Sequence, residues 1–265
     1  MSDVAVIIVA AGKSTRFKNE NYKKPFVAIH GRALWLHCAD RFLIRDDVKQ
    51  LILVIAEQDQ QIFDERFGAE AAVLGIDVIY GGNNRAQSVL NGLGAVQDNI
   101  NLVAVHDAAR PCLSDIWIDE LFQVARQTGA AILGTPVVST VKRVTAHQID
   151  ETIPRDGLWE SQTPQMFDKT KLLAAYQAAD DYSLATDEAQ LMEWAGHSIS
   201  IIAASPLNRK VTTQDDLEFV ELAMRALPQR SLESSNPEQT VRDGHSDSRN
   251  LQTLDEDFWL SLIHI

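Results

Sequence analysis

VAVIIVA, at residues 4–10, is a continuous apolar run of the kind found in strands that are buried on both faces of a sheet. LILVIA at 51–56 and LVAVHD at 102–107 repeat this pattern, and stretches with amphipathic helical spacing separate such runs, as in ALWLHCADRFL from residue 33. Strands that alternate with helices form parallel βαβ units. The sequence therefore predicts an α/β fold, a doubly wound and mostly parallel sheet with helices on both faces.

Two segments interrupt the alternation. Residues 138–157 interleave Thr, Lys, Arg and His with Val and Ile, which is typical of a protruding hairpin or arm that contacts a second subunit or serves as a lid. From residue 228 the composition changes to Ser, Asn, Gln, Asp and Glu, which is typical of disorder. We therefore expect one folded domain over residues 1–227 and a polar, disordered tail over 228–265.

Composition narrows the possible function classes. The 265 residues include no stretch of the roughly 18 or more apolar residues that a membrane helix needs. A net charge of −13 argues against a binder of nucleic acid or acidic membranes, although local Lys and Arg can still hold a small phosphorylated ligand. Cys38 and Cys112 lack the spacing of a zinc site or a disulfide framework, and no signal-peptide pattern is present. We expect a cytoplasmic protein without nucleic-acid or membrane partners.

A basic loop follows the first predicted strand. Ala10, Ala11 and Gly12 are small enough for the backbone to approach phosphates closely, and Arg16 and Lys24 supply positive charge. The loop lacks the glycine spacing of a Walker motif and of a dinucleotide fingerprint, which argues against an NAD-linked oxidoreductase. The pattern favours a triphosphate site, with an ordinary basic loop as the alternative.

The strand at 102–107 ends in VHDAARP, residues 105–111. Ligands of doubly wound sheets lie beyond the carboxyl ends of the strands, so Asp107 and Arg110 are placed at the ligand-binding edge. Asp107 suits Mg²⁺ or a sugar hydroxyl, because a hard cation prefers oxygen ligands. We expect the neighbouring His106 to be satisfied by backbone groups.

These motifs occur in one chain with GGNNRAQSV, IPRDGLWESQTPQMF, TDEA and NRKVTTQDDL. In this order they resemble the 2-C-methyl-D-erythritol 4-phosphate cytidylyltransferases of the non-mevalonate isoprenoid pathway, over about residues 4–227. VHDAARP and the GLW-x-x-QTPQ-x-F stretch are the most specific. The resemblance implies a Rossmann-like nucleotidyltransferase that joins CMP from CTP to 2-C-methyl-D-erythritol 4-phosphate, with Mg²⁺ or another divalent cation, as a homodimer.

The resemblance also implies roles for individual residues. Arg16 and Lys24 stabilise charge on the reacting phosphorus, and Asp107 lies beside Mg²⁺ that is bound through the CTP phosphates. The nucleotide-binding residues are Ala10, Ala11, Gly12, Gly82, Asn83, Arg85 and Ser88. The acceptor-binding residues are Arg110, Thr140, Arg155, Thr163, Thr186 and Lys210, with Arg155 and Lys210 as a phosphate clamp. Because Thr140 and Arg155 fall in the arm, the arms of two subunits are expected to complete each other's sites.

The chain departs from the family pattern at three places. Ser14 replaces the usual second glycine of the first loop, Pro25 replaces a usual glutamine, and Asn83 replaces a residue that is often acidic. None of the three removes a charge that the chemistry needs. Two of the implied contacts have a plain alternative, since Thr163 also suits a turn before a proline and Thr186 also suits a helix N-cap.

Two other functions fit parts of the pattern. A ribitol-5-phosphate cytidylyltransferase shares the fold, HDA-x-RP and QTPQ, but the alanine in AAG and the alanine in HDAARP favour the methylerythritol enzyme. A non-catalytic nucleotide-binding paralogue is the alternative from a different class. The retained Arg16, Lys24, Asp107, Arg155 and Lys210 argue against it, since a binder does not need cations around a reacting phosphorus.

Overall fold

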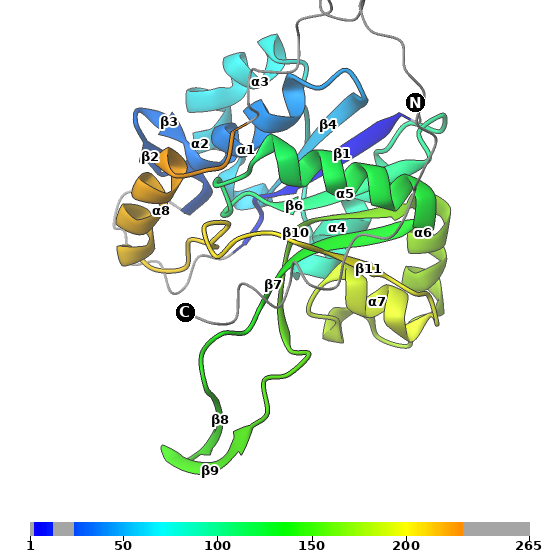
Figure 1. The fold of residues 1–265 in the computed structure, drawn as a ribbon. Helices are drawn as coiled ribbons and strands as arrows, with labels where there is room; N and C mark the ends of the chain where they lie inside the picture. The colour runs from blue at the N-terminus through cyan, green and yellow to red at the C-terminus, as the bar shows by residue number, and fades with distance from the viewer. Residues whose placement is uncertain (1–2, 13–23, 230–265) are drawn as a thin grey trace, which may run out of the picture. The chain divides into compact units, whose positions relative to one another are not determined.

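The computed structural model of the protein describes residues 3–12 and 24–229, all within one compact unit, Met1–Arg230 (Figure 1). The strands are β1 Val4–Val9, β2 Ala28–Ile29, β3 Arg32–Ala33, β4 Val48–Ile55, β5 Asp77–Tyr80, β6 Leu102–Asp107, β7 Ala130–Pro136, β8 Val141–Thr145, β9 Gln148–Ile153, β10 Trp159–Asp168 and β11 Ser200–Ala203. The α-helices are α1 Leu34–Leu43, α2 Gln60–Phe63, α3 Ala69–Val73, α4 Arg85–Gly94, α5 Asp115–Thr128, α6 Lys169–Ala178, α7 Glu188–Trp194 and α8 Asp215–Arg225, and the shorter turns are η1 Lys24–Phe26, η2 Glu57–Asp59, η3 Asp64–Gly68 and η4 Tyr182–Leu184. No helix in the described part of the chain is both long and apolar enough to cross a membrane.

Seven strands form the central sheet, in the order β11-β7-β10-β6-β1-β4-β5. β1 runs parallel to β6 and β4, β5 runs parallel to β4, and β11 runs parallel to β7. β10 is antiparallel to both of its neighbours, β6 and β7. The predicted mostly parallel sheet is confirmed, and its antiparallel member, β10, was not predicted.

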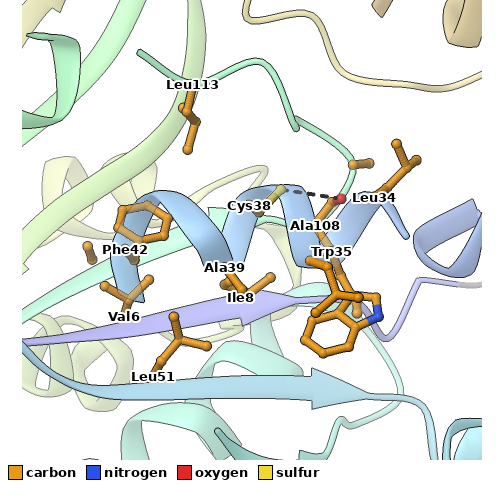
Figure 2. Close-up of a cluster of buried hydrophobic side chains, with 14 of the residues drawn as sticks. Val6, Ile8, Leu34, Trp35, Cys38, Ala39, Phe42, Leu51, Ala108 and Leu113 are labelled. Atoms are coloured by element: carbon orange, nitrogen blue, oxygen red, sulfur yellow. Dashed lines mark hydrogen bonds between the residues drawn. The ribbon is translucent and has the colours of Figure 1, made fainter. Parts of the chain in front are cut away.

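Successive residues of β1 point to opposite faces of the sheet. Because residues on both faces are apolar, helices cover both. Val6 and Ile8 enter one hydrophobic core with α1, α5 and α8, whereas Ile7 enters a second core with α4, α6 and α7. Figure 2 shows α1 across the first face, with the side chains of Val6 and Ile8 of β1 between this helix and the strand. A fully buried side chain such as Phe42 contributes about 1.5–3 kcal/mol, so the two cores fix the strand ends that carry the site.

Gly92 lets α4 approach the sheet closely. A Cβ at this position would lie 2.7 Å from Cγ2 of Ile7, which is too close for an ordinary contact. At the other end of the helix, the side chain of Asn84 caps the N-terminus by accepting a hydrogen bond from the backbone N–H of Gln87. This packing and capping together fix Arg85, the first residue of α4, at the edge of the sheet.

The arm predicted at residues 138–157 is a hairpin of β8 and β9, which confirms its form. Ala146 and His147 make the turn with φ angles of 48° and 65°. Exposed side-chain pairs join the two strands, among them Arg143 with Glu151 at 2.6 Å. Figure 1 shows the hairpin as an extension between β7 and β10. Its residues are almost all exposed, and exposed ion pairs of this kind contribute little stability.

Candidate active site

The candidate site lies where β1 and β6 end and β10 begins. Asp107, the last residue of β6, is paired in register with Val9 at the end of β1. β10 runs the opposite way, so the first half of this strand lies at the same edge, and the hydroxyl of Thr163 accepts a hydrogen bond from the backbone N–H of Asp107 at 3.0 Å. The antiparallel strand therefore brings QTPQ next to HDAARP.

Asp107 is held between two cations. Lys210 donates to its Oδ2 at 2.6 Å, and Arg85 Nε donates to its Oδ1 at 3.1 Å. Burial alone would raise the pKa of Asp107, but Arg85 and Lys210 outweigh burial and hold this pKa well below its ordinary value. The carboxylate therefore stays ionised throughout the neutral range.

Arg85 connects this pair to a buried glutamate that the sequence analysis did not select. Its Nη1 donates to Oε1 of Glu188 at 2.7 Å, and the hydroxyl of Tyr176 donates to the same oxygen at 3.3 Å. Burial raises the pKa of Glu188, although Arg85 opposes the rise. The side chains of Glu188, Arg85, Asp107 and Lys210 thus form a row of alternating charge.

A cleft of about 210 Å³ opens beside this row. It contains the positive charges of Arg85, Arg110 and Lys210 and the negative charges of Asp107 and Asp187. The remaining lining residues are polar: Ser161, Gln162, Thr163, Gln165 and Thr186. Four predicted acceptor-binding residues line the cleft together, namely Arg110, Thr163, Thr186 and Lys210. Such a lining suits a small anion that also carries hydroxyl groups.

His106 and Thr163 form the floor beneath Asp107. His106 is fully buried, and its Nε2 lies 3.0 Å from the carbonyl oxygen of Arg110 while its Nδ1 lies 3.1 Å from the hydroxyl of Thr163. These partners assign a donor role to Nε2 and an acceptor role to Nδ1. Burial lowers the pKa of His106 to about 4. The expectation that backbone groups satisfy this histidine is confirmed in part, since Thr163 is its second partner.

Some of the predicted nucleotide-binding residues form a second group near the ends of β1 and β5, but Arg85, which was also assigned to the nucleotide, lines the cleft instead. A Cβ at Gly81 would lie 2.6 Å from the Cβ of Ala11 and 2.6 Å from the hydroxyl oxygen of Ser88. The same hydroxyl donates to the carbonyl of Asn84 at 2.8 Å and accepts the backbone N–H of Gly82 at 3.1 Å. The structure thus brings Ala11, Gly82 and Ser88 together and gives Ser88 a further role in holding the turn before α4.

The profile of the 2-C-methyl-D-erythritol 4-phosphate cytidylyltransferase family matches residues 4–226. The enzyme of that name from Rhodopirellula baltica is 36% identical over 231 residues, which cover 83% of this chain and 94% of the relative. The one from Halalkalibacterium halodurans is 36% identical over 220 residues, or 83% of this chain and 96% of the relative. The crystal structure of 4-diphosphocytidyl-2C-methyl-D-erythritol synthase from Anaerococcus prevotii superposes with a TM-score of 0.70 at 27% identity, over 84% of this chain and 96% of that one.

The chain belongs to the 2-C-methyl-D-erythritol 4-phosphate cytidylyltransferase family. It is accordingly an enzyme and a nucleotidyltransferase. The resemblance inferred from its motifs is confirmed over almost the whole predicted domain.

In this cytidylyltransferase the basic loop is described only at its ends. Ala10 is buried and Gly12 is exposed, whereas Ser14 and Arg16 lie outside the described residues. Lys24 begins η1, in which Pro25 is buried. The roles of Arg16 and Lys24 at the reacting phosphorus stay predictions.

Two predicted acceptor-binding residues lie apart from the cleft within one chain. Thr140 and Arg155 are exposed on the arm, and Arg155 Nη1 donates to the carbonyl of Val138. Lys210 lies in the cleft instead, so one cytidylyltransferase chain by itself does not assemble the predicted phosphate clamp.

The N-cap expected at Thr186 belongs to the next residue. The side chain of Asp187 accepts the backbone N–H of Gln190 at 3.0 Å and caps α7, while the backbone N–H of Thr186 donates to the side chain of Gln190 at 2.8 Å. An Asp caps a helix N-terminus at least as well as a Thr, and the TDEA motif contains one of each as a possible N-cap. Thr186 itself is exposed and lines the cleft.

Two carboxylates line the cleft as possible Mg²⁺ ligands, those of Asp107 and Asp187, and both already accept hydrogen bonds. The described residues contain no group of three or more His, Cys, Asp or Glu side chains that could hold a metal ion. Both oxygens of Asp107 already accept hydrogen bonds from cationic side chains. This fits a magnesium ion that is held mainly by substrate phosphates, with a carboxylate as a further ligand, which is a common arrangement for this ion.

Proposed function

We propose that the protein transfers the cytidylyl group of CTP to 2-C-methyl-D-erythritol 4-phosphate and releases pyrophosphate. The observation that carries the proposal is the cleft in which Arg85, Arg110 and Lys210 surround Asp107 at the carboxyl ends of β1 and β6. The family match over residues 4–226 supports the choice of both substrates.

The reaction needs charge stabilisation more than proton transfer. The second pKa of a phosphate monoester is about 6, so the attacking oxygen of the acceptor is mostly deprotonated at neutral pH. His106 is unsuited as a general base, because both ring nitrogens are engaged and its pKa is about 4. The enzyme must therefore hold two polyanions in line and neutralise charge as the bond to the α-phosphorus forms and pyrophosphate departs.

We assign the cations of the chain to these two polyanions. Arg16 and Lys24 act on the α-phosphate of CTP, and Lys210 with Arg155 holds the phosphate of the acceptor. Asp107 orients Lys210 through the 2.6 Å contact and faces the hydroxyl groups of the acceptor. Mg²⁺, bound with CTP, would neutralise the triphosphate oxygens, and we assign Asp107 as its carboxylate ligand.

We assign cytosine recognition to the group formed by Ala10, Ala11, Gly12, Gly82, Asn83 and Ser88. The proximity of Ala11, Gly81 and Ser88 supports a shared surface of backbone groups. A bound base covers such groups, and a base that leaves them unpaired is rejected strongly. CTP should therefore be used well above UTP, ATP and GTP, and equal turnover with ATP under the same conditions would refute this assignment.

The active form in this proposal is a homodimer in the cytoplasm. Thr140 and Arg155 lie on an exposed arm apart from their own cleft, so a second copy of the chain would supply them to it. Symmetric dimers are the commonest oligomers. The buried free thiols of Cys38 and Cys112 support a reducing compartment.

One assay separates this function from its alternatives. Pyrophosphate release from CTP is measured with 2-C-methyl-D-erythritol 4-phosphate, with ribitol 5-phosphate and with no acceptor. We expect release with the first acceptor only. Faster release with ribitol 5-phosphate would identify the other cytidylyltransferase, and CTP binding without release under any condition would identify a non-catalytic paralogue.

A further inference from the structure

Lys210 is carried by a loop, residues 204–214, between β11 and α8. A lysine has a long flexible side chain, so the position of its ammonium group depends on how firmly the backbone is held. Part of this support is the hydrogen bond from the backbone N–H of Val211 to the carbonyl of Ala109 at 2.8 Å. The remaining support in the first half of the loop centres on Asn208.

Asn208 is fully buried and uses its side chain to bind β10. Its Nδ2 donates to Oε1 of Gln162 at 3.0 Å and to the backbone carbonyl of Thr163 at 3.0 Å. Gln162 returns a hydrogen bond from its own amide to the carbonyl of Ser205 at 3.1 Å. Two buried amides thus fasten the loop to the start of the antiparallel strand.

The backbone of Asn208 binds a third part of the site. Its carbonyl oxygen accepts Nη1 of Arg110 at 2.7 Å. One buried residue therefore contacts the strand of Thr163, contacts Arg110 directly and lies two residues before Lys210. These three residues come from segments that are far apart in the sequence and meet in the cleft.

We propose that Asn208 is a positioning residue for the acceptor phosphate, because its buried hydrogen bonds to β10 and to Arg110 fix the loop that delivers Lys210 to the cleft. The inference rests on the proposed function, in which Lys210 and Arg110 bind the acceptor. Ordering a loop costs conformational entropy for each residue that is fixed, and the folded chain has met this cost before substrate arrives. The loop then needs no further ordering when the substrate binds, which is the advantage of a preorganised site.

A second anchor holds the other side of Lys210. The carboxylate of Asp216 accepts the backbone N–H groups and hydroxyls of Thr212 and Thr213, together with Nε of Arg209. This cluster ties the loop to α8 without touching β10 or Arg110. We expect it to keep the loop folded when Asn208 is changed, so that loss of positioning can be separated from loss of the fold.

The test uses Asn208→Asp and Asn208→Ser in the full chain. Asn208→Asp keeps the volume, but it replaces the donor amide by a carboxylate that would face two carbonyl oxygens. Asn208→Ser is smaller and neutral, and it serves if the charged variant does not fold. Gln50→Ala is the matched control, because Gln50 is also buried and donates to Asp77 at 2.8 Å and to the carbonyl of Ala95 at 2.9 Å, away from the cleft.

Steady-state kinetics with each substrate varied in turn, and melting temperatures, are measured for all variants. We expect both Asn208 variants to raise the KM for the acceptor by about 10- to 100-fold, the range that a misplaced binding group produces, with the KM for CTP nearly unchanged. In a Lys210→Ala background the Asn208→Ser change should raise the acceptor KM by no more than about 3-fold, because coupled residues do not add. Gln50→Ala should lower the melting temperature without moving either KM.

The possible results separate this inference from the proposed function. A wild-type enzyme that does not turn over the acceptor would refute the function and this inference with it. An active wild type whose Asn208 variants behave like Gln50→Ala would overturn the inference alone. The same holds if their effect on the acceptor KM were undiminished in the Lys210→Ala background.

Discussion

The cleft beside Asp107 and the arm at residues 138–157 carry the two parts of the predicted acceptor site, and their construction differs. In the cleft each charged group is held by groups from other elements: Lys210 by Asp107, Arg85 by Glu188, and Arg110 by the backbone of Asn208. On the arm the side-chain pairs join only β8 and β9, as between Lys142 and Thr152 at 2.7 Å.

The difference shows what one chain can preorganise. In the cleft, burial and opposite charges shift pKa values and fix geometry before any ligand arrives. The arm is exposed, so its ion pairs are weak and its site residues face solvent. Thr140 and Arg155 therefore need a further surface to act on a substrate, whereas Arg110, Thr163 and Lys210 do not.

Lys24 should produce the largest effect, because it is assigned to the reacting phosphorus itself. Lys24→Ala should lower kcat by about 100- to 1,000-fold, the typical loss when one preorganised donor to developing charge is removed, with a smaller change in the KM for CTP. Steady-state kinetics measures both constants. Lys49→Ala, on the exposed start of β4, is the control and should leave both unchanged. If Lys24→Ala changed only the acceptor KM, Lys24 would bind the acceptor phosphate, as proposed for Arg155, and its assignment to the triphosphate would be wrong.

The floor of the cleft should respond to pH through His106. Its folded-state pKa is about 4, below the ordinary value of 6.5, so the unfolded chain binds the additional proton between these values. The free energy of unfolding should therefore be highest above pH 6.5 and should fall by up to about 3 kcal/mol as the pH decreases toward 4.

Denaturant unfolding of wild type and His106→Gln between pH 4 and 7 isolates this effect. Glu188 has a raised pKa and works in the opposite direction over the lower part of this range, but it is present in both proteins. The wild-type curve should be steeper than that of His106→Gln. Parallel curves would mean that His106 does not stay neutral in the folded chain.

Much of the fold follows from the sequence because buried parallel strands have an unambiguous pattern. The runs at 4–10, 51–56 and 102–107 correspond to β1, β4 and β6, and the polar residues after the last run reach the cleft as expected. β10 has no such apolar run, because its sequence, WESQTPQMFD, begins with polar residues and contains a proline. Its identity as a strand depends on antiparallel pairing with β6 and β7, which are distant in sequence from one another.

The site residues that the sequence did not predict are recognised by their contacts in the fold and not by a local sequence pattern. Glu188 stands in the quoted TDEA motif, but nothing in the sequence shows that it lies 2.7 Å from Arg85, which is 103 positions away. Asn208 opens the quoted NRKVTTQDDL in the same way. Large aromatic residues at helical or strand spacing are usually buried, yet Trp159 and Trp194 are 37% and 50% exposed whereas Trp117 is buried, because spacing alone does not show which face of an element is covered.

Arg155 tests the arm directly. Arg155→Ala should raise the KM for the acceptor by about 10- to 100-fold, as expected when a charged hydrogen bond to the phosphate is lost, with kcat less affected. Asp107→Asn should damage the cleft instead. Neither variant alone decides whether the arm acts on its own cleft or on that of a second copy.

Mixing the two variants does decide it. Random exchange in a dimer places half of the chains in mixed pairs, each with one intact cleft facing one intact arm. At an acceptor concentration below the wild-type KM, where Arg155→Ala alone has little activity, activity should therefore rise to about a quarter of wild type. Light scattering should give the mass of a dimer. No gain on mixing, or a monomer with full activity, would show that the arm folds over its own cleft or is not needed.

The tail contributes no residue to either region, and its removal should have the smallest effect. Ending the chain after Leu227 removes residues 228–265 but none of the predicted site residues, so activity should stay within a few-fold of the full chain. Stability should fall slightly, because Ser114, which caps α5, donates to the carbonyl of Pro228 at 2.7 Å, and one such hydrogen bond is worth about 1 kcal/mol. A second truncation after Gln229 keeps this bond and should unfold at the same denaturant concentration as the full chain. If both truncations were inactive or insoluble, the apolar segment at 258–265 would be needed by the folded enzyme, and the prediction of a dispensable tail would be wrong.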